Sequence, residues 1–507
     1  MDKRAELLTW KVSSLSLVIL QDYSILCRLT LLLPVPLDPG TGTTWFTCAT
    51  STTADVPKAV ESSQAAFLEY RLTNPRLRAE LLYEWYRLIN ESRQDLATIL
   101  TYESGKPLAE SLGEIAYANG FTRWFAGEAE RVFGEVSTPA ALNRRAITIK
   151  QPVGVAVALI PWNFPISMLL RKAAAALAAG CTMIVKPSPE TPLTAVALGL
   201  LAIRAGLPPG VLNVLRPDHQ STPSLSKALC EHDLVKKVTF TGSTNVGKLI
   251  SSLCAPGLKK LTLELGGNCP FVVFDDSDLE YVAEQLMALK WRHAGQACIA
   301  ANRIFVQDTI YDTFVQIMVD KTKRLVIGHG SDPNTNVGPM TTRNGVERAI
   351  KLVDNAQKHG GRVLIGGQEP TGLNGFFFNP TIIANANLDM DLARDELFCP
   401  VLSLFSFETE EQALQLANNT SMGLASYVFT RDVDRLWRMF GMFAQNDDLI
   451  LGLADGREPR HFLSNHCCPP AANCHFIENL EAGMIGLNTG MANLIDYTLN
   501  VSHSSFI

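Results

Sequence analysis

Strands and helices alternate regularly along residues 151–265, and this alternation constrains the fold more than any other feature of the sequence. The apolar run at 153–160 predicts a buried strand, and Pro165 begins an Ala- and Leu-rich helix that stops at Gly180. The same rhythm repeats up to residue 265. A chain that alternates in this way forms a parallel sheet covered by helices. We therefore predict an α/β fold with a Rossmann-type, dinucleotide-binding sheet.

The rest of the chain extends this α/β plan. With 507 residues, the protein is long enough for two or three domains. Residues 53–132 predict helices, 145–150 predict a strand, and a second α/β region follows Gly267. A net charge of −6, without any basic block, excludes the surfaces typical of nucleic-acid-binding proteins. The eleven cysteines are scattered, which favours a reducing compartment over a disulfide framework.

The N-terminal region is apolar but resembles no standard targeting segment. Residues 11–37 are interrupted by charged and polar side chains, and the uncharged run at 12–21 is too short to span a bilayer. No small-residue cleavage site follows it cleanly. We therefore predict a poorly ordered or buried extension and a cytoplasmic protein without membrane contact, with a mitochondrial location as the alternative.

Three polar side chains stand where a parallel sheet would bring them together. Asn163 separates a strand from a helix, Glu264 ends an apolar strand before two glycines, and Cys298 follows Gly-Gln-Ala. Ligands bind at the carboxyl edge of such sheets. A nucleophilic thiolate needs a lowered pKa and partial exposure. Taken singly, each residue also has an ordinary structural explanation: a turn amide, a surface carboxylate or an inert buried thiol.

Two further segments lie between a strand and a helix and suit a dinucleotide. Lys186 begins the first and can reach cofactor hydroxyl groups. In the second, Gly242 and Ser243 precede a helix whose first N–H groups can hold a diphosphate. The spacing from Gly242 to Gly247 is not the usual dinucleotide fingerprint, so this motif alone is weak.

The motifs PWNFP, VKPSPETP, FTGS, ELGG and GQAC, in this order and spacing, resemble the aldehyde dehydrogenase superfamily over 38–442 and 476–490. The resemblance implies that Cys298 is the nucleophile, Glu264 the general base and Asn163 an oxyanion donor. It implies NAD or NADP as the cofactor, a small aldehyde as the substrate, and no metal. The positions that match cofactor contacts are Trp162, Lys186, Ser188, Pro189, Gly242, Ser243, Gly247, Glu396 and Phe398.

Two arginines close to the predicted site indicate the substrate. Arg171 lies eight residues after Asn163, and Arg292 lies six residues before Cys298. These segments resemble succinate-semialdehyde dehydrogenases, in which arginines at the matching positions hold the substrate carboxylate. Oxidation of succinate semialdehyde to succinate, the last step of 4-aminobutyrate breakdown in that family, is therefore expected. Glutarate semialdehyde, a broader range of aldehydes, or a catalytically impaired variant remain alternatives.

Three positions depart from the family pattern. Pro189 stands where many NAD-preferring members carry a ribose-binding glutamate, so we expect NADP to be accepted as well as NAD. Ala300 replaces the second cysteine of some relatives, which excludes their redox switch. Cys399 replaces a glycine, and we expect it to strain the turn that carries Glu396 and Phe398.

The ends of the chain depart further. Residues 443–475 match nothing in the family, and their His and Cys spacing fits no standard zinc site. Beyond Gly490 the resemblance to the family's final strand, which joins a neighbouring subunit, is lost. We therefore expect a less stable, less oligomeric and less active protein than a relative that keeps this strand. The predicted regions are an extension at 1–37, a cofactor domain at 38–265 with a bridging, oligomerisation strand near 145–150, a catalytic domain at 266–442, an insert at 443–475 and a C-terminal part at 476–507.

Overall fold

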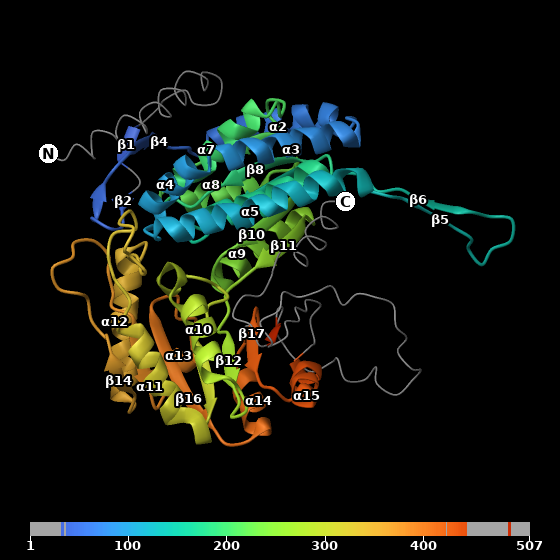
Figure 1. The fold of residues 1–507 in the computed structure, drawn as a ribbon. Coiled ribbons are helices and arrows are strands. Elements are labelled where there is room, and N and C mark those ends of the chain that lie inside the picture. Colours follow the sequence, from blue (N-terminus) through green and yellow to red (C-terminus); the bar gives the residue numbers. More distant parts are fainter. Residues whose placement is uncertain (1–31, 35–36, 422, 444–484, 488–507) are drawn as a thin grey trace.

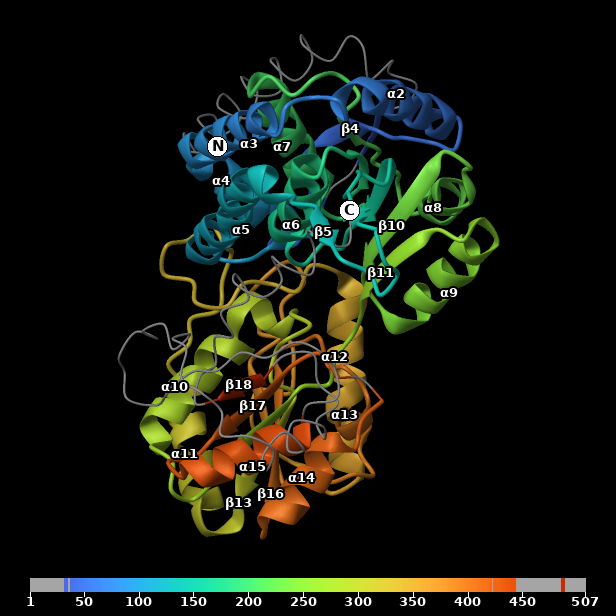
Figure 2. The same ribbon diagram turned by 90° about the vertical axis from the view of Figure 1, so that its right-hand side faces the viewer.

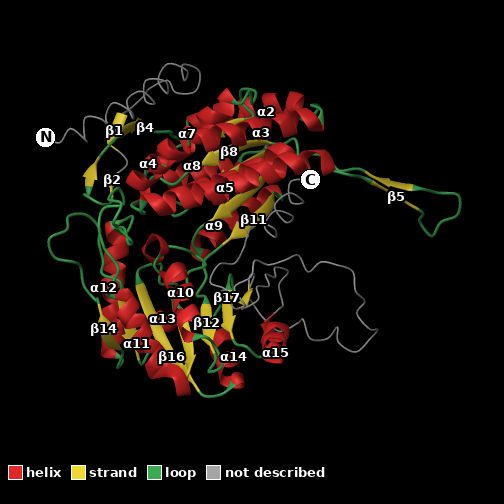
Figure 3. Ribbon diagram, viewed as in Figure 1, coloured by secondary structure: helices red, strands yellow, loops and turns green. Residues whose placement is uncertain are grey.

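The computed structural model describes residues 32–34, 37–421, 423–443 and 485–487. Figure 1 shows two α/β bodies, one above the other, each with its own main sheet. Figure 3 shows how helices cover these sheets. The α/β fold predicted from the strand–helix alternation is confirmed. The predicted extension, insert and C-terminal part lie almost entirely outside the described residues.

Helices cover one side of the upper body, as the sequence predicts for 53–132. Asn74 caps the second of them by accepting a hydrogen bond from the Arg76 N–H, with Pro75 in its first turn. The third ends at Gly105, which has a φ of 84°. The bounds are α2 Asp55–Tyr70, α3 Pro75–Glu91, α4 Arg93–Ser104, α5 Leu108–Glu128 and the short η1 Ala129–Arg131.

The upper sheet is parallel, and its described strands follow the order β11-β10-β7-β8-β9. Buried Val, Ile and Ala residues fill the central strands because helices cover both faces. Its strands are β7 Val155–Leu159, β8 Thr182–Lys186, β9 Leu212–Val214, β10 Val235–Thr241 and β11 Lys260–Glu264. The helices between and after them are α6 Pro165–Ala178, α7 Pro192–Arg204, α8 Thr222–Glu231, α9 Thr244–Cys254 and η2 Ala255–Gly257.

The strand order reverses at β7, which pairs with β8 on one side and with β10 on the other. The chain moves outward through β8 and β9, and then returns to the opposite side of β7 to form β10 and β11. Such a switch point opens a space between loops at the carboxyl ends of the strands. The sheet therefore directs ligands to the loops that follow β7, β8, β10 and β11.

The lower sheet has the described order β14-β15-β16-β13-β12-β17-β18, and only β14 runs antiparallel to its neighbour. Its strands are β12 Pro270–Val273, β13 Arg303–Gln307, β14 Arg362–Ile365, β15 Thr381–Ala384, β16 Val401–Phe407, β17 Ser426–Phe429 and β18 Ile485–Leu487. Its helices are α10 Leu279–Lys290, η3 Arg292–Gly295, η4 Asp308–Ile310, α11 Tyr311–Thr322, α12 Arg343–Lys358, α13 Asp391–Arg394, α14 Glu410–Asn418 and α15 Val433–Phe443. Strand β17 and the short helix α13 were not predicted from the sequence.

A hairpin extends away from the upper body (Figure 1). Its strands, β5 Glu135–Ser137 and β6 Ala146–Thr148, pair antiparallel, and all of their residues are exposed. The second strand coincides with the strand predicted at 145–150. Two more short antiparallel pairs form near the N-terminal side, from β1 Leu32–Pro34, β2 Leu37–Asp38, β3 Thr43–Thr44 and β4 Thr47–Ala49.

The two bodies are joined directly after β11 (Figure 2). Strand β11 ends at Glu264 in the upper sheet, and β12 begins at Pro270 in the lower sheet. Among the described helices, none has the length and apolar character that crossing a bilayer requires. The predicted compartment remains a prediction.

Candidate functional site

The residues predicted to act together lie at the carboxyl edge of the upper sheet. Lys186 ends β8 and Glu264 ends β11, while Asn163 follows β7 and Ser243 follows β10. All four therefore occupy the switch point of the sheet, where ligands of open α/β folds bind.

Asn163 lies in the short connection between β7 and α6. Its side chain is buried, and its Nδ2 donates a hydrogen bond to the Gln296 carbonyl oxygen at 3.1 Å. Its own carbonyl accepts a hydrogen bond from Lys106 Nζ at 2.8 Å. A primary amide carries two N–H donors, so one remains for a ligand. Asn163 therefore contacts the segment of Cys298 and retains a donor suited to an oxyanion.

The segment before Cys298 has an unusual backbone. His293 and Ala294 have φ values of 50° and 51°, and Gly295 follows with 74°. Left-handed conformations cost energy in side chains other than glycine, so the surroundings must hold this turn in place. A Cβ at Gly295 would collide with the Cys399 carbonyl oxygen. The chain thus reaches the half-buried Cys298 through a tightly fixed turn.

The surroundings of Cys298 act against the lowered pKa that a nucleophilic thiolate needs. Burial raises the pKa of the thiol, and the carboxylates of Glu264 and Glu396 raise it further, with a smaller effect of Cys269. Arg171 opposes them without reversing the direction. Burial is the main cause of the raised pKa, and the two neighbouring carboxylates add to it.

Glu264 is held as a carboxylate. Arg171 donates to Oε1 at 3.2 Å, Thr241 Oγ1 donates to Oε2 at 3.1 Å, and Lys172 Nζ lies 3.8 Å from Oε2. Burial would raise the pKa of Glu264, but these cations and hydrogen bonds outweigh it and leave the pKa below its ordinary value. Glu264 is thus ionised and can accept a proton.

The two arginines predicted to bind substrate lie near Tyr117. Arg171 is buried and contacts the Tyr117 hydroxyl at 3.3 Å as well as Glu264. Arg292 is half-buried, with its guanidinium over the Phe164 ring at 5.2 Å. Burial raises the pKa of Tyr117, and both arginines oppose that rise, so both guanidinium groups act on the same hydroxyl. Their buried Nε atoms have no hydrogen-bond partner in the described part of the chain.

The connection after β8 contains a carboxylate, Glu190, whose role was not predicted from the sequence. Burial lowers the pKa of Lys186 to about 8, and Glu190 opposes this shift. Ser188 donates a hydrogen bond to Glu190, which also lies 3.9 Å from His219. An acidic group therefore lies one residue after Pro189, the position at which the sequence offers no carboxylate.

The start of α9 suits a diphosphate. Ser243 caps the helix in an extended conformation, and its hydroxyl makes no capping hydrogen bond. The hydroxyl and the first N–H groups of the helix therefore remain available to an anion. Gly247 lets α9 pack tightly, because a Cβ there would collide with Leu265. At Gly242 a Cβ would lie 2.5 Å from the Phe240 ring.

Glu396 and Phe398 come from the lower body and approach the upper one. Glu396 accepts a hydrogen bond from the Gly267 N–H, and burial raises its pKa to about 7. Its buried Oε1 has no partner among the described residues, as expected of a group that awaits a ligand hydroxyl. Phe398 meets the Trp162 ring edge-on at 5.5 Å. These features fit a bound dinucleotide.

The strained residue of this turn is Phe398, not Cys399. Phe398 has a φ of 53° and therefore a left-handed backbone conformation, whereas the backbone of Cys399 does not adopt this conformation. The turn that carries Glu396 and Phe398 therefore contains a strained residue, as expected, but the backbone of Cys399 itself is not the strained one. The positive φ belongs to the preceding residue, whose ring faces Trp162.

Several residues around the site were missed by sequence reasoning. Cys269 donates its thiol to the Cys298 carbonyl at 3.3 Å. Lys172 and Tyr117 contact the Glu264 and Arg171 pair. Charged groups from the beginning of α5 reach the segments of Asn163 and Cys298. Lys106, Glu110 and Glu114 are spaced by four in an otherwise apolar region, and this spacing is the feature of the sequence from which they could have been predicted.

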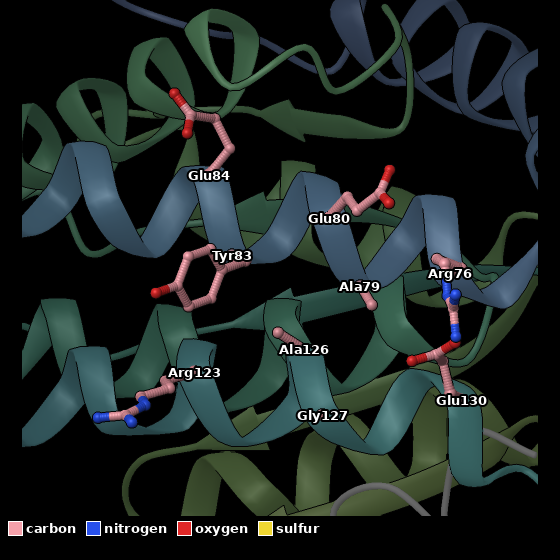
Figure 4. Close-up of a pocket in the computed structure, with 9 residues that line it drawn as sticks. All are labelled: Arg76, Ala79, Glu80, Tyr83, Glu84, Arg123, Ala126, Gly127 and Glu130. Carbon is pink, nitrogen blue, oxygen red and sulfur yellow. The ribbon is translucent and has the colours of Figure 1, made fainter.

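A surface groove between α3 and α5 contains none of the predicted residues (Figure 4). It is lined by Arg76, Ala79, Glu80, Tyr83, Glu84, Arg123, Ala126, Gly127 and Glu130. Arg76 and Glu130 neutralise each other at 2.9 Å at one end. Exposed ion pairs of this kind contribute little to stability. The residues that line the groove do not include the nucleophile, base or cofactor residues predicted from the sequence.

A family model described as "Aldehyde dehydrogenase family" matches residues 35–444. The chain belongs to the aldehyde dehydrogenase family. It is therefore an oxidoreductase, and the superfamily resemblance inferred from the sequence is confirmed.

Curated relatives cover most of the chain. It is 42% identical to a Schizosaccharomyces pombe protein named as an NADP(+) succinate-semialdehyde dehydrogenase, over 82% of this chain and 84% of that protein. It is 41% identical to the glutarate-semialdehyde dehydrogenase of Pseudomonas putida, over 82% and 86% respectively. A crystal structure of succinate-semialdehyde dehydrogenase from Burkholderia pseudomallei matches with a TM-score of 0.81 and 38% identity, covering 91% and 87%.

The cofactor is NAD or NADP. An oxidised nicotinamide accepts a hydride from an aldehyde carbon, and this is the redox chemistry that the cofactor supplies when bound. Lys186, Ser243 and Glu396 are the residues suited to hold it.

Proposed function

We propose that this aldehyde dehydrogenase oxidises succinate semialdehyde to succinate through a covalent adduct on Cys298. The observation that supports it most directly is the pair of arginines that act on one tyrosine beside the Glu264 carboxylate. Both guanidinium groups keep a buried, unpartnered Nε within the described residues. A carboxylate at the far end of the substrate would satisfy such donors.

The residues divide the chemistry in the following way. The Cys298 thiolate attacks the aldehyde carbon, and the resulting oxyanion is held by the Asn163 amide and the Cys298 N–H. After loss of a hydride, a thioester remains on the sulfur. Glu264 then removes a proton from water, which hydrolyses the thioester to the carboxylic acid and frees the thiol.

The ionised state of Glu264 supports its role as the base. Its pKa lies below the ordinary value although the group is buried, because Arg171 and Lys172 outweigh the burial. Arg171 thus has two neighbours in this proposal: Glu264 in the free enzyme and the substrate carboxylate in the complex. If Arg171 moved from Glu264 to the substrate carboxylate, the Glu264 carboxylate would be free to act as the base next to the thioester.

The chain length of the substrate is a separate part of the specificity. The relative named glutarate-semialdehyde dehydrogenase is nearly as similar to the chain as the succinate-semialdehyde relative. One methylene changes binding by only ~1–3 kcal/mol. We therefore propose glutarate semialdehyde as a second, slower substrate of the same site.

Cofactor reduction with succinate semialdehyde, compared with butanal, tests the proposal. Charged hydrogen bonds contribute about 1.5–3 kcal/mol, so we expect kcat/KM for the semialdehyde to be about 10- to 100-fold higher. Substituting Arg292→Leu should remove most of this preference, whereas Arg292→Lys should retain part of it. Equal efficiency with both aldehydes would overturn the substrate assignment but not the oxidation itself.

A further inference from the structure

Three charged residues at the start of α5 lie at intervals of four and point into the protein. Lys106 precedes the helix, and Glu110 and Glu114 belong to its first two turns. Lys106 and Glu114 are buried, and Glu110 is partly buried. Residues spaced by four share a helix face, so these groups form one polar row. None of them is a predicted catalytic or cofactor residue.

Glu114 and Lys106 hold the Asn163 segment. Glu114 Oε1 accepts hydrogen bonds from the Ile166 and Ser167 N–H groups, at 3.0 Å and 3.2 Å. These belong to the first turn of α6, where a carboxylate satisfies otherwise free donors. Lys106 Nζ donates to Glu114 Oε2 at 2.5 Å and to the Asn163 carbonyl at 2.8 Å.

Glu110 holds the Cys298 segment from the same helix. Its Oε2 accepts a hydrogen bond from the His293 N–H at 2.7 Å. His293 is the first of the left-handed residues, and its carbonyl accepts the Gln296 side-chain amide at 2.9 Å. The Gln296 carbonyl in turn accepts the Asn163 amide. One helix therefore holds both segments, and Gln296 links them.

The aromatic rings between these segments leave little freedom to move. The imidazole of His293 lies between the rings of Trp162 and Phe164, at 6.0 Å and 5.8 Å. Lys106 Nζ lies 4.1 Å from the centre of the Phe164 ring. Trp162 and Phe164 flank Asn163 in the sequence. A shift of either segment would therefore move the other.

A buried ion pair often adds little net stability to a fold. Well-packed apolar side chains of similar volume are often as stable or more stable, because burying charges costs several kcal/mol per ion. Around α5 the charged side chains instead hold two backbone segments, one from the upper body and one from the lower body. Orientation of reacting groups has a large effect on rate, and a 1 Å error costs about 100-fold.

We propose that Lys106, Glu110 and Glu114 are positioning residues that set the place of the Asn163 amide relative to the Cys298 sulfur. This inference rests on the proposed function, because it assigns the Asn163 amide to the oxyanion of the Cys298 adduct. The row itself touches neither the substrate nor the reacting atoms, and it acts through the two segments that it holds.

The test compares Glu110→Leu with Glu110→Gln in the full chain. Leucine removes the acceptor for the His293 N–H, whereas glutamine keeps an oxygen there. With the aldehyde that the wild type oxidises fastest, we expect Glu110→Leu to lower kcat about 10- to 100-fold with a small change in KM. Glu110→Gln should keep most of the activity. Glu128→Leu is the matched control, since Glu128 lies at the other end of α5 and, among the described residues, its ion pair is with Arg131.

A double-mutant cycle separates positioning from a general loss of structure. If Glu110 acts through Asn163, the variant with both Glu110→Leu and Asn163→Ala should be no slower than Asn163→Ala alone. Independent, multiplying losses would overturn the inference. So would a kcat for Glu110→Leu equal to that of the Glu128→Leu control.

Hydrogen exchange gives a readout that needs no substrate. In Glu110→Leu, or in Glu110→Ala if the leucine variant does not fold, the acceptor for the His293 N–H is lost, and the amides of 161–168 and 292–299 should exchange faster together. Unchanged exchange in both segments would overturn the inference. Failure of the wild type to oxidise any aldehyde would instead reject the proposed function, and the exchange result would still decide whether the row holds both segments.

Discussion

At the residue scale, Glu264 has two effects on Cys298 that oppose each other. Its charge raises the pKa of the thiol, and its carboxylate is the base proposed for thioester hydrolysis. Replacing Glu264 with glutamine removes both the charge and the base, and the two consequences can be measured separately. We expect steady-state turnover to fall about 100- to 10,000-fold, because general bases contribute that much.

The same variant should make the thiol more reactive. Without the Glu264 charge, the pKa of Cys298 falls and more thiolate is present near neutral pH. Alkylation by iodoacetamide should be faster than in the wild type at equal pH. Slower alkylation would show that Glu264 does not act on the sulfur electrostatically.

Glu190 gives a second test at this scale. Its carboxylate lies beside Ser188 and near Lys186, where an additional phosphate of NADP is expected to bind. Removing one repulsive charge of this kind is worth about 1 kcal/mol. We expect Glu190→Gln to raise the ratio of kcat/KM with NADP to that with NAD about fivefold. An unchanged ratio would place the phosphate elsewhere.

The sequence located the residues that follow strands, and it missed those that act from a distance. Asn163 and Glu264 were predicted because a parallel sheet gathers the carboxyl ends of its strands. Glu110 was not, since its partner His293 lies 183 positions further along the chain. Neither periodicity nor a motif reports which loop a helix face will meet after folding.

At the scale of elements, the turn before Cys298 depends on Gly295. Its φ of 74° disfavours any side chain, and a Cβ would collide with the Cys399 carbonyl oxygen. We expect Gly295→Ala to lower the free energy of unfolding by more than about 2 kcal/mol and to abolish turnover. Gly113→Ala in α5, where a Cβ meets nothing within 4 Å, should be neutral or stabilise the protein by about 0.5–1 kcal/mol. Denaturant unfolding compares the two.

The junction between α4 and α7 should respond to pH. Glu103 accepts hydrogen bonds from the Leu193 and Thr194 N–H groups, and burial raises its pKa from 4.5 to about 7. The folded state therefore binds this proton more tightly than the unfolded state does. The contribution to stability is fully present below pH ~4.5 and is lost as pH rises through ~7. In Glu103→Gln the decline of unfolding free energy between these values should be smaller by about 1–3 kcal/mol. An identical decline would show that Glu103 does not titrate in this range.

The elements themselves were largely predictable, and their exceptions have physical reasons. Each strand of the upper sheet was predicted because it is apolar and bounded by glycine or proline. Strand β17 was missed because Ser426–Phe429 is only four residues long. The helix face of α5 was hard to assign because the helix packs against α3, α4 and α6, and its apolar residues are distributed around the helix.

At the scale of the whole molecule, the β5–β6 hairpin extends away from the described part of its own chain. Val136, Leu142 and Ile147 are 71%, 90% and 73% exposed, although all three are large and apolar. Exposed strand edges with apolar side chains promote pairing between chains. The family resemblance also implies that subunits pair through this region. We therefore expect the chain to associate through the hairpin, and its mass in solution to increase with concentration.

Replacing both Val136 and Ile147 with lysine should shift that equilibrium toward the monomer without disturbing the site. The hairpin strands pair only with each other in the described structure, so the unfolding temperature of the monomer should change little. Light scattering measured over a range of concentrations, together with turnover per subunit, tests this. If the variant and the wild type have the same mass at every concentration, the hairpin is not the contact. If turnover per subunit falls in step with the mass, the catalytic site depends on assembly as well as on its own two sheets.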